Sequence, residues 1–324
     1  MTRVLPSRFG WLWLAGAILL ILLATIALSL TQGAAETTSE IVLSIRAPRI
    51  GMALVVGAGL AAAGVLMQGS LRNPLADPAL VGISSGAALG CVLAAVLGVG
   101  FGGLGSGLAA TTGAATAMVI VVWASLRDGR PEVVTLLLSG VAIAAFAGAL
   151  VSIIVNVSPD AGVRSLAFWT AGSLALANWS GVIAVVPFVL VGLIIAGTVA
   201  RSLDVLSLGD RDATAAGIDV SRVRAWSLLA VVFLIGAGVA AVGVIAFLGL
   251  VIPHAVRLVI GPRTAPLLIV STILGALVLL AADTLARTIA NPVEIPVGAV
   301  TALVGAPVFF LLLRRTRASQ GGWA

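Results

Sequence analysis

Two arginines near the start of this apolar chain have the type and spacing needed to bind acidic groups. Arg46 and Arg49 flank Pro48, whose ring restricts the backbone between them. A guanidinium group binds a carboxylate through two parallel hydrogen bonds, so this pair could hold carboxylates on another molecule. Arginines at a helix end can instead anchor the helix at a membrane surface by extending their charged heads toward water. The sequence leaves both roles open.

A second charged pair, Asp283 and Arg287, has the four-residue spacing that places both side chains on one helix face. A carboxylate at membrane depth usually marks a functional site such as an ion pathway. Pairing with Arg287 would instead give Asp283 a structural role. The sequence leaves this alternative open as well.

Residues suited to catalysis or metal binding are scarce. The lone His254 has no histidine or cysteine at ligand spacing, and the lone Cys91 lies in an apolar run, which excludes an intrachain disulfide. All 18 cationic side chains are arginines, so the chain lacks the GxxxxGK[ST] loop that cradles nucleotide phosphates. We therefore predict no catalytic residue, no metal site and no permanently bound cofactor. Any ATP would be hydrolysed by a separate polypeptide.

The composition indicates an integral membrane protein built from helices. Hydrophobic residues make up 60% of the chain and charged residues 9%, and the mean hydropathy is +1.22. Soluble domains typically have about 25% charged residues. Runs of about 20 apolar residues fit membrane-spanning helices, and the alternating segments of a membrane barrel are not found. The arginines are spread over the ends of these runs rather than clustered, which argues against nucleic-acid binding.

The apolar runs predict a single all-α transmembrane domain over 1–324. The division within 223–260 rests on Gly236, Gly238 and Gly243, which mark a break in a run nearly twice as long as one helix needs. The ten expected spans are 11–31, 46–69, 79–98, 105–126, 133–156, 179–200, 223–243, 244–260, 264–287 and 297–313.

The arginines also predict the orientation, because positively charged loops tend to stay in the cytoplasm. With ten spans both termini lie on one side, and placing them in the cytoplasm puts fourteen of the 18 arginines inside. The four outside are Arg46, Arg49, Arg164 and Arg287. We therefore predict a multi-pass protein in contact with membrane lipid, with both termini in the cytoplasm.

The longest hydrophilic interruption, 201–224, falls on the cytoplasmic side in this topology. Its leucines alternate with polar residues, Asp210 and Asp212 could begin a short helix, and Asp219 could begin another. Two short helices along the membrane face would suit docking into the groove of a partner protein. An ordinary loop is the alternative, although 24 residues exceed the usual connection length.

Five blocks of sequence follow one another along the chain in a characteristic order. They are RAPR at 46–49, QGSLRNPLADPALVGISSGAALG at 68–90, LGDRDATAAGIDV at 208–220, FLGLVIPHAVRLVIGP at 247–262, and ADTLART at 282–288 followed by EIPVGAVTALVGAP at 294–307. Through these blocks nearly the whole chain resembles the permease family of bacterial ATP-binding-cassette (ABC) importers for ferric siderophores, haem and cobalamin. Five blocks in order make the match specific.

This resemblance implies the type II ABC importer permease fold, with about ten transmembrane helices, in the bacterial inner membrane. It also implies a homodimer of permeases with two ATPase subunits, which bind ATP and Mg²⁺, on the cytoplasmic side. A periplasmic or lipid-anchored binding protein delivers the substrate. The permease itself is then no enzyme.

The matching motif positions also assign roles to individual residues. Docking of the binding protein falls to Arg46, Arg49 and Arg287. Coupling to the ATPase falls to a helical element at about 203–219. Within that element the matching residues are Leu208, Gly209, Asp210, Ala213 and Gly217. The translocation path is expected along 133–156 and at Gly305, Ala306 and Pro307.

The substrate remains open among three chelate classes. An apolar path with few fixed charges suits any large ligand that must pass without binding tightly. The phrases LAFWTAGSLA and AAGIDVSRVR are slightly more similar to haem permeases, so we place haem ahead of ferric siderophores and cobalamin third. An ion-coupled secondary transporter is the alternative from another class, and Asp283 is its candidate carboxylate.

Overall fold

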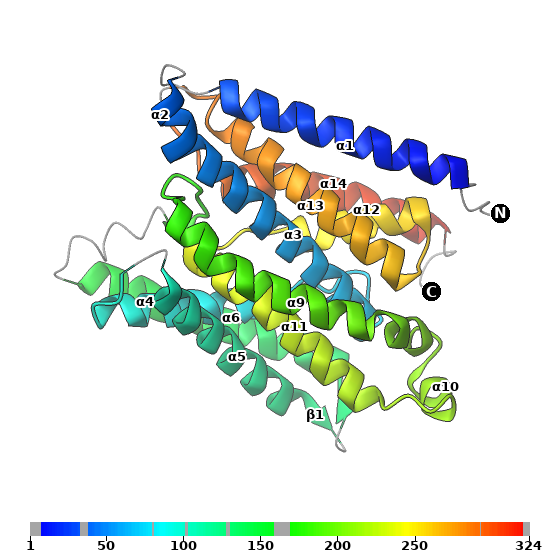
Figure 1. Ribbon diagram of the computed structural model, residues 1–324. Helices are drawn as coiled ribbons and strands as arrows, with labels where there is room; N and C mark the ends of the chain where they lie inside the picture. Colours follow the sequence, from blue (N-terminus) through cyan, green and yellow to red (C-terminus); the bar gives the residue numbers. More distant parts are fainter. Residues whose placement is uncertain are drawn as a thin grey trace.

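The computed structural model describes residues 8–32, 38–79, 81–100, 103–127, 130–158, 169–291 and 293–319. Within these ranges the protein is a bundle of helices (Figure 1), and the predicted all-α membrane fold is confirmed. A short antiparallel hairpin pairs β1 (Leu126–Arg127) with β2 (Arg130–Pro131). The helices are α1 (Arg8–Thr31), α2 (Ser39–Ile41), the π-helical turn η1 (Val42–Arg46), α3 (Ala47–Ser70), α4 (Ile83–Val96), α5 (Leu104–Ser125), α6 (Val133–Val157), α9 (Trp179–Leu206), α10 (Asp210–Ala215), α11 (Val220–Val242), α12 (Leu248–Ile260), α13 (Thr264–Ala286) and α14 (Val297–Ser319).

Ten apolar helical segments in the described ranges correspond to the ten predicted spans. Six of them are long and apolar enough to cross a membrane: Ser39–Ser70, Leu104–Ser125, Val134–Val157, Trp179–Leu206, Val220–Val242 and Thr264–Ala286. Four are shorter: Leu20–Thr31, Ile83–Val96, Leu248–Ile260 and Val297–Leu311. Helix α4 has 14 residues and so rises about 21 Å, which is less than the ~30 Å hydrocarbon core of a bilayer. Helices α4 and α12 are therefore shorter than their apolar runs predicted.

The loop before α4 extends into the predicted span, which was expected to begin at 79. The Asn73 side chain accepts a hydrogen bond from the backbone of Leu75 at 2.9 Å, and Asp77 accepts one from Ala79 at 2.7 Å. These side-chain turns compete with helix formation. Gly82 then adopts a left-handed conformation, with φ +81°, directly before α4 begins. The predicted start at 79 is thus four residues too early.

The predicted break within 223–260 is confirmed, and it lies at Gly243. This residue has φ +75°, and a Cβ atom there would lie 2.0 Å from the carbonyl oxygen of Trp169. Only glycine fits such a position. Gly236 and Gly238 lie inside α11 instead, where a Cβ on Gly236 would collide with α5. Those two glycines therefore serve helix packing and not the break.

Helix α3 lies in the middle of the bundle, with α13 on one side and α9 and α11 on the other (Figure 1). Its backbone approaches its neighbours closely. A Cβ atom on Gly57 would lie 2.4 Å from the carbonyl oxygen of Gly275 in α13. One on Gly64 would lie 1.8 Å from that of Gly249 in α12. Small residues permit this close packing where apolar burial alone does not drive helices together.

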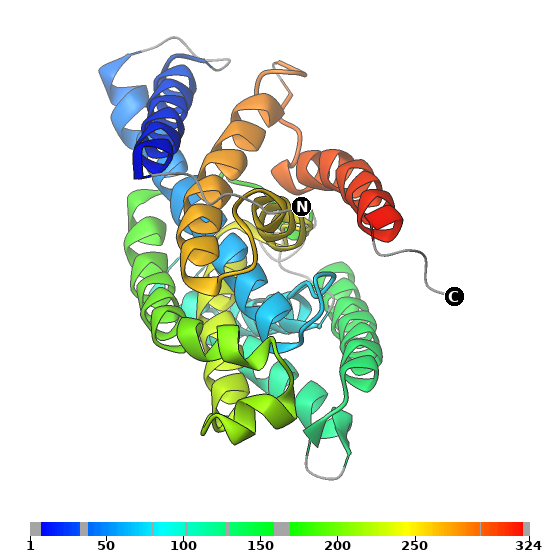
Figure 2. The same cartoon turned by 90° about the vertical axis from the view of Figure 1, so that its right-hand side faces the viewer.

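Helices α6 and α14, by contrast, lie along one side of the bundle (Figure 2) and expose large apolar side chains. Leu138 and Phe146 of α6 are 66% and 62% exposed, and Leu303 of α14 is 77% exposed. A membrane lipid or another apolar protein surface would cover such a face.

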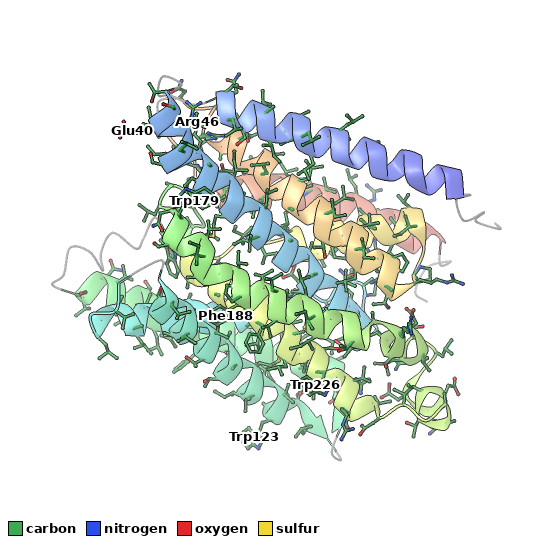
Figure 3. The ribbon with its side chains drawn as sticks, in the orientation of Figure 1. Glu40, Arg46, Trp123, Trp179, Phe188 and Trp226 are labelled. Atoms are coloured by element: carbon green, nitrogen blue, oxygen red, sulfur yellow. The ribbon has the colours of Figure 1, made fainter. Side chains whose placement is uncertain are left out.

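Exposed tryptophans mark the two ends of the bundle (Figure 3). Trp179 lies at the same end as Arg46 and donates a hydrogen bond to the carbonyl oxygen of Leu43 at 3.0 Å. Trp123 and Trp226 lie toward the other end. Tryptophan favours the two interfaces between membrane and water. Their positions agree with a bundle that crosses the membrane roughly along α3.

Candidate functional site

The predicted docking and coupling residues gather at the two ends of α3, whereas the predicted path residues lie in α14. We call the first group the Arg49 cluster; it consists of Arg49, Asp283, Arg287 and Glu294. Arg49 lies in the first turn of α3, and Asp283 lies in the last turn of α13. Nε of Arg49 donates to both carboxylate oxygens of Asp283 at 3.0 Å, and Nη2 donates to Oδ1 at 2.8 Å. Nη1 donates to Oε1 of Glu294 at 2.8 Å.

Arg287 and Arg46 connect this cluster to α1. Arg287 donates to the carbonyl oxygen of Gln32 at 3.0 Å and to the carbonyl and hydroxyl oxygens of Ser29. Arg46 donates to the carbonyl oxygen of Leu30. The last carbonyl groups of a helix have no partner within the helix, and cationic side chains are favourable there. The two arginines therefore hold the C-terminal end of α1 against α3 and α13.

Asp283 and Arg287 form the pair that their spacing predicted. Nε of Arg287 lies 3.8 Å from Oδ2 of Asp283, although the closer partner of this carboxylate is Arg49. Asp283 is fully buried and lies near the end of its helix. These contacts support a structural role for Asp283 and not a role in an ion pathway. Its carboxylate is occupied by two arginines, unlike the relay group that a secondary transporter would need.

The sequence-based picture of Arg46 and Arg49 as outward-facing guanidinium forks needs correction. Arg46, Arg49 and Arg287 are 3%, 7% and 7% exposed. Their hydrogen bonds go to acceptors within this chain that are distant in sequence, and no local pattern could predict these partners. Glu294, which the sequence analysis missed, is the more accessible member of the cluster, with 38% of its side chain exposed. Docking to another protein stays a prediction. The fourth predicted external arginine, Arg164, lies outside the described residues.

The second group lies at the other end of α3, and we call it the Asp210 junction; it consists of Asp210, Arg224, Arg72 and the carbonyl of Ser70. Arg224 lies near the start of α11, and its Nη2 donates to Oδ1 of Asp210 at 2.9 Å. Its Nε donates to the carbonyl oxygen of Ser70, the last residue of α3, at 3.2 Å. Nη2 of Arg72 lies 3.7 Å from the same carboxylate oxygen.

The predicted coupling residues surround this junction on and beside α10. Leu208 is 70% exposed, whereas Ala213 is fully buried. Gly209 and Gly217 have φ +130° and +82° and bound the helix on both sides. These conformations suit glycine and explain why the short helix begins and ends where it does.

Of the two short helices predicted in this segment, the one at Asp210 is present as α10, whereas Asp219 caps the start of the 23-residue helix α11. In addition, α9 continues without a break to Leu206. Val199, Leu203 and Leu206 are buried at helical spacing, so their packing extends α9. Asp219 does begin the following helix, since its side chain accepts a hydrogen bond from the backbone of Arg222 at 3.0 Å. Only α10 is a separate short helix in the described part of 201–224.

Beside α10 the surface is hollowed between α5, α10 and α11. The hollow has a volume of about 930 Å³. Its lining includes Leu126, Asp210, Thr214, Ile218, Ser221 and Arg224. Apolar and charged side chains thus share a concave surface beside α10 in the polar segment 201–224.

The three predicted path residues in α14 differ in burial. Gly305 is buried, and a Cβ atom there would lie 2.5 Å from Cβ of Phe247. Ala306 and Pro307 are exposed. Gly305 is therefore a packing residue in this conformation, while the other two lie on the open side of the bundle. Within the described ranges, no group of His, Cys, Asp or Glu residues is arranged to hold a metal ion.

Comparison with known proteins identifies the family. The FecCD transport family matches residues 11–315. The cobalamin import system permease protein BtuC of Halobacterium salinarum is 43% identical over 282 residues, which cover 87% of this chain and 75% of that protein. The hemin transport system permease protein HmuU of Yersinia pestis is 42% identical over 283 residues, covering 86% of this chain and 85% of that protein.

A solved structure supports the same assignment. It is described as an inward-facing conformation of a metal-chelate type ABC transporter, and it superimposes with a TM-score of 0.82 at 31% identity. The match covers 93% of this chain and 98% of that one. With six long apolar helices in the described ranges, the chain is a multi-pass membrane protein. It belongs to the FecCD transport family of ABC-importer permeases.

Proposed function

We propose that this chain, as one transmembrane permease domain, is the membrane subunit of an ATP-driven importer for haem or a related iron chelate. The observation that carries the proposal is the arrangement along α3. A charged cluster lies at each end of this central helix, and one of them includes an exposed helical element beside a hollow. Transport would proceed by alternating access between the two ends of the bundle.

The distribution of arginines supports an orientation with both termini in the cytoplasm of a bacterial inner membrane. In that orientation the Asp210 junction and α10 face the cytoplasm, and the Arg49 cluster faces the periplasm. The exposed Leu208 and the hollow beside α10 would then receive a surface of an ATPase subunit. Two such subunits would bind ATP and Mg²⁺ and hydrolyse the nucleotide, so this chain would perform no bond chemistry.

We propose that the face around Arg46, Arg49 and Arg287 receives acidic groups of a periplasmic or lipid-anchored binding protein. The charges at this end support this, because Arg46, Arg49 and Arg287 lie close together beside the carboxylates of Asp283 and Glu294. An incoming carboxylate would meet Glu294 first and compete with it for Nη1 of Arg49.

A second copy of the permease would cover the apolar side formed by α6 and α14. The exposed Leu138, Phe146 and Leu303 support a protein interface or a lipid boundary there. A hollow of about 250 Å³ between α4 and α6 carries the hydroxyl groups of Ser85, Ser152 and Thr170. In a homodimer this hollow would adjoin a path along α6 and α14, where Ala306 and Pro307 are exposed.

The substrate stays a proposal among three classes. Haem comes first, followed by ferric siderophores and cobalamin, and relatives named for haem and cobalamin are about equally similar to this chain. An ion-coupled transporter is not favoured, because the Asp283 carboxylate is bound by two arginines.

Reconstitution tests the proposal. The chain would be expressed with ATPase and binding-protein subunits from its own source, and the complex placed in liposomes. We expect uptake that requires ATP and the binding protein, and a haem absorption band on that binding protein. Uptake of cobalamin or a siderophore alone would reassign the substrate. Uptake driven by an ion gradient without ATP would contradict the importer class.

A further inference from the structure

The Arg224 side chain joins three helices with one guanidinium group. It belongs to α11, donates from Nε to the carbonyl oxygen of Ser70 at the end of α3, and donates from Nη2 to Asp210 at the start of α10. The side chain is only 12% exposed, so water competes little for these bonds. A planar guanidinium is suited to two acceptors at once, which a single ammonium group is not.

Helix α10 has few other contacts that could fix its position. It has six residues, of which Ala213 alone is buried. Helices this short are not stable by themselves. Gly209 and Gly217, both with positive φ, connect it to α9 and α11. Its placement relative to the bundle therefore depends strongly on the bond between Asp210 and Arg224.

Helix α3 is suited to carry a displacement away from this junction. Most of its residues are buried, and its backbone touches α13 at Gly57 and α12 at Gly64. Closely packed interiors transmit strain because they have no free volume to absorb it. A shift of the Ser70 end would therefore move the neighbouring helices as well.

We propose that Arg224 is a positioning residue that ties α10 to α3 through Asp210, so that motion of α10 is delivered to the centre of the bundle. Asp210 then serves this connection within the chain, and the exposed Leu208 serves contact with the ATPase. The inference rests on the proposed function, because it assigns the path by which an ATPase movement reaches the permease.

The decisive variant is Arg224→Lys, which keeps the charge but cannot reach both Ser70 and Asp210. Asp210→Ser breaks the same connection from the other side, and Asp212→Ser is the matched control on the exposed side of α10. Each variant is reconstituted as the full complex with ATPase subunits and binding protein. Retention of the ATPase subunits, ATP hydrolysis and substrate transported per ATP are measured.

We expect Arg224→Lys and Asp210→Ser to retain the ATPase subunits within about twofold. Transport per ATP should fall about tenfold, the effect of losing one charged hydrogen bond from the coupled movement. Asp212→Ser should match the unmodified protein.

Three results would overturn the inference. They are an unchanged transport-to-ATP ratio in Arg224→Lys, a loss of ATPase subunits that accounts for the whole defect, or an equal defect in Asp212→Ser. If Arg224→Lys is not recovered in folded form, Asp210→Ser decides by the same three criteria. If the unmodified chain binds no ATPase subunit, the proposed function itself fails, and the inference fails with it.

Discussion

The two charged clusters at the ends of α3 differ in how far they are buried. In the Arg49 cluster the side chains of Arg49 and Asp283 are 8% and 0% exposed. In the Asp210 junction the side chains of Asp210 and Arg72 are 27% and 44% exposed. A buried charge that loses its partner is strongly destabilising, whereas exposed ion pairs contribute about 0–1 kcal/mol. The Arg49 end of α3 is therefore held by buried charges. The Asp210 junction combines a weak, exposed pair to Arg72 with the main bond from Arg224, whose side chain is 12% exposed.

Both ends nevertheless use the same structural device. Arginines satisfy carbonyl groups at the C-terminal end of a helix and bind a carboxylate at the same time. Arg287 does so between α1 and α13, and Arg224 does so between α3 and α10. The difference between the two connections is thus one of burial and not of residue type.

Removing the buried carboxylate should have the largest effect. Asp283→Ala would leave Arg49 buried without its main partner and remove the nearby opposite charge from Arg287. We therefore expect the free energy of unfolding to fall by about 3–5 kcal/mol. Unfolding in detergent micelles measures the loss. Asp212→Ala, an exposed change on α10, is the control and should stay within about 0.5 kcal/mol. A loss below about 1 kcal/mol for Asp283→Ala would contradict the rigid picture of this end.

Asp77 offers a test by pH near the other end of α3. Burial raises the pKa of its carboxyl group from 3.8 to about 6, despite the hydrogen bond from Ala79. The folded protein thus binds this proton more tightly than the unfolded chain does. The stabilising contribution is complete below about pH 3.8 and is lost as pH rises through about 6.

Asp77→Asn removes this dependence and keeps an oxygen that can accept from Ala79. At pH 7.5 the variant should be more stable by up to about 3 kcal/mol, since one pKa unit corresponds to about 1.4 kcal/mol. The advantage should shrink at pH 5. Unfolding measured at both pH values checks the prediction, which fails if the difference between the two proteins does not change with pH.

Glu294→Gln tests whether the accessible part of the Arg49 cluster can bind an external carboxylate. It weakens the competitor for Nη1 of Arg49 without exposing Asp283. If acidic groups of a binding protein dock here, their affinity should rise by about three- to tenfold, or about 1 kcal/mol. The dissociation constant of the purified binding protein measures this, with Glu40→Gln, an exposed change at the same end of the bundle, as control (Figure 3). Weaker binding in Glu294→Gln would refute the competition.

The smallest effect is expected for Arg72→Gln. Its ion pair with Asp210 is long, at 3.7 Å, and almost half of the Arg72 side chain is exposed. We expect a change in the free energy of unfolding below about 0.5 kcal/mol. A loss of several kcal/mol would mean that the Asp210 junction is as rigid as the Arg49 cluster, and the contrast between the two ends would disappear.

Local features of the fold were predictable from sequence because they depend on neighbours along the chain. The apolar runs, the break at Gly243 and the helix start at Asp219 follow from hydropathy, backbone conformation and side-chain capping. The pair Asp283 and Arg287 follows from helical spacing. The sequence analysis ended this span at 200 and missed the continuation of α9 to Leu206. The polar residues on its exposed face were interpreted as part of the hydrophilic interruption, although Leu203 and Leu206 on the other face are buried.

The amino-acid sequence by itself determined that this protein is a helical membrane permease, because chain composition and motif order are properties of the sequence alone. The tertiary structure alone decided what the charged residues bind. Arg49 and Asp283 are 234 residues apart, and Arg224 and Ser70 are 154 apart. No local periodicity connects such positions. Only the packing of α3 among its neighbours brings them together and makes the pair of Arg49 and Asp283 buried and the Asp210 junction more exposed.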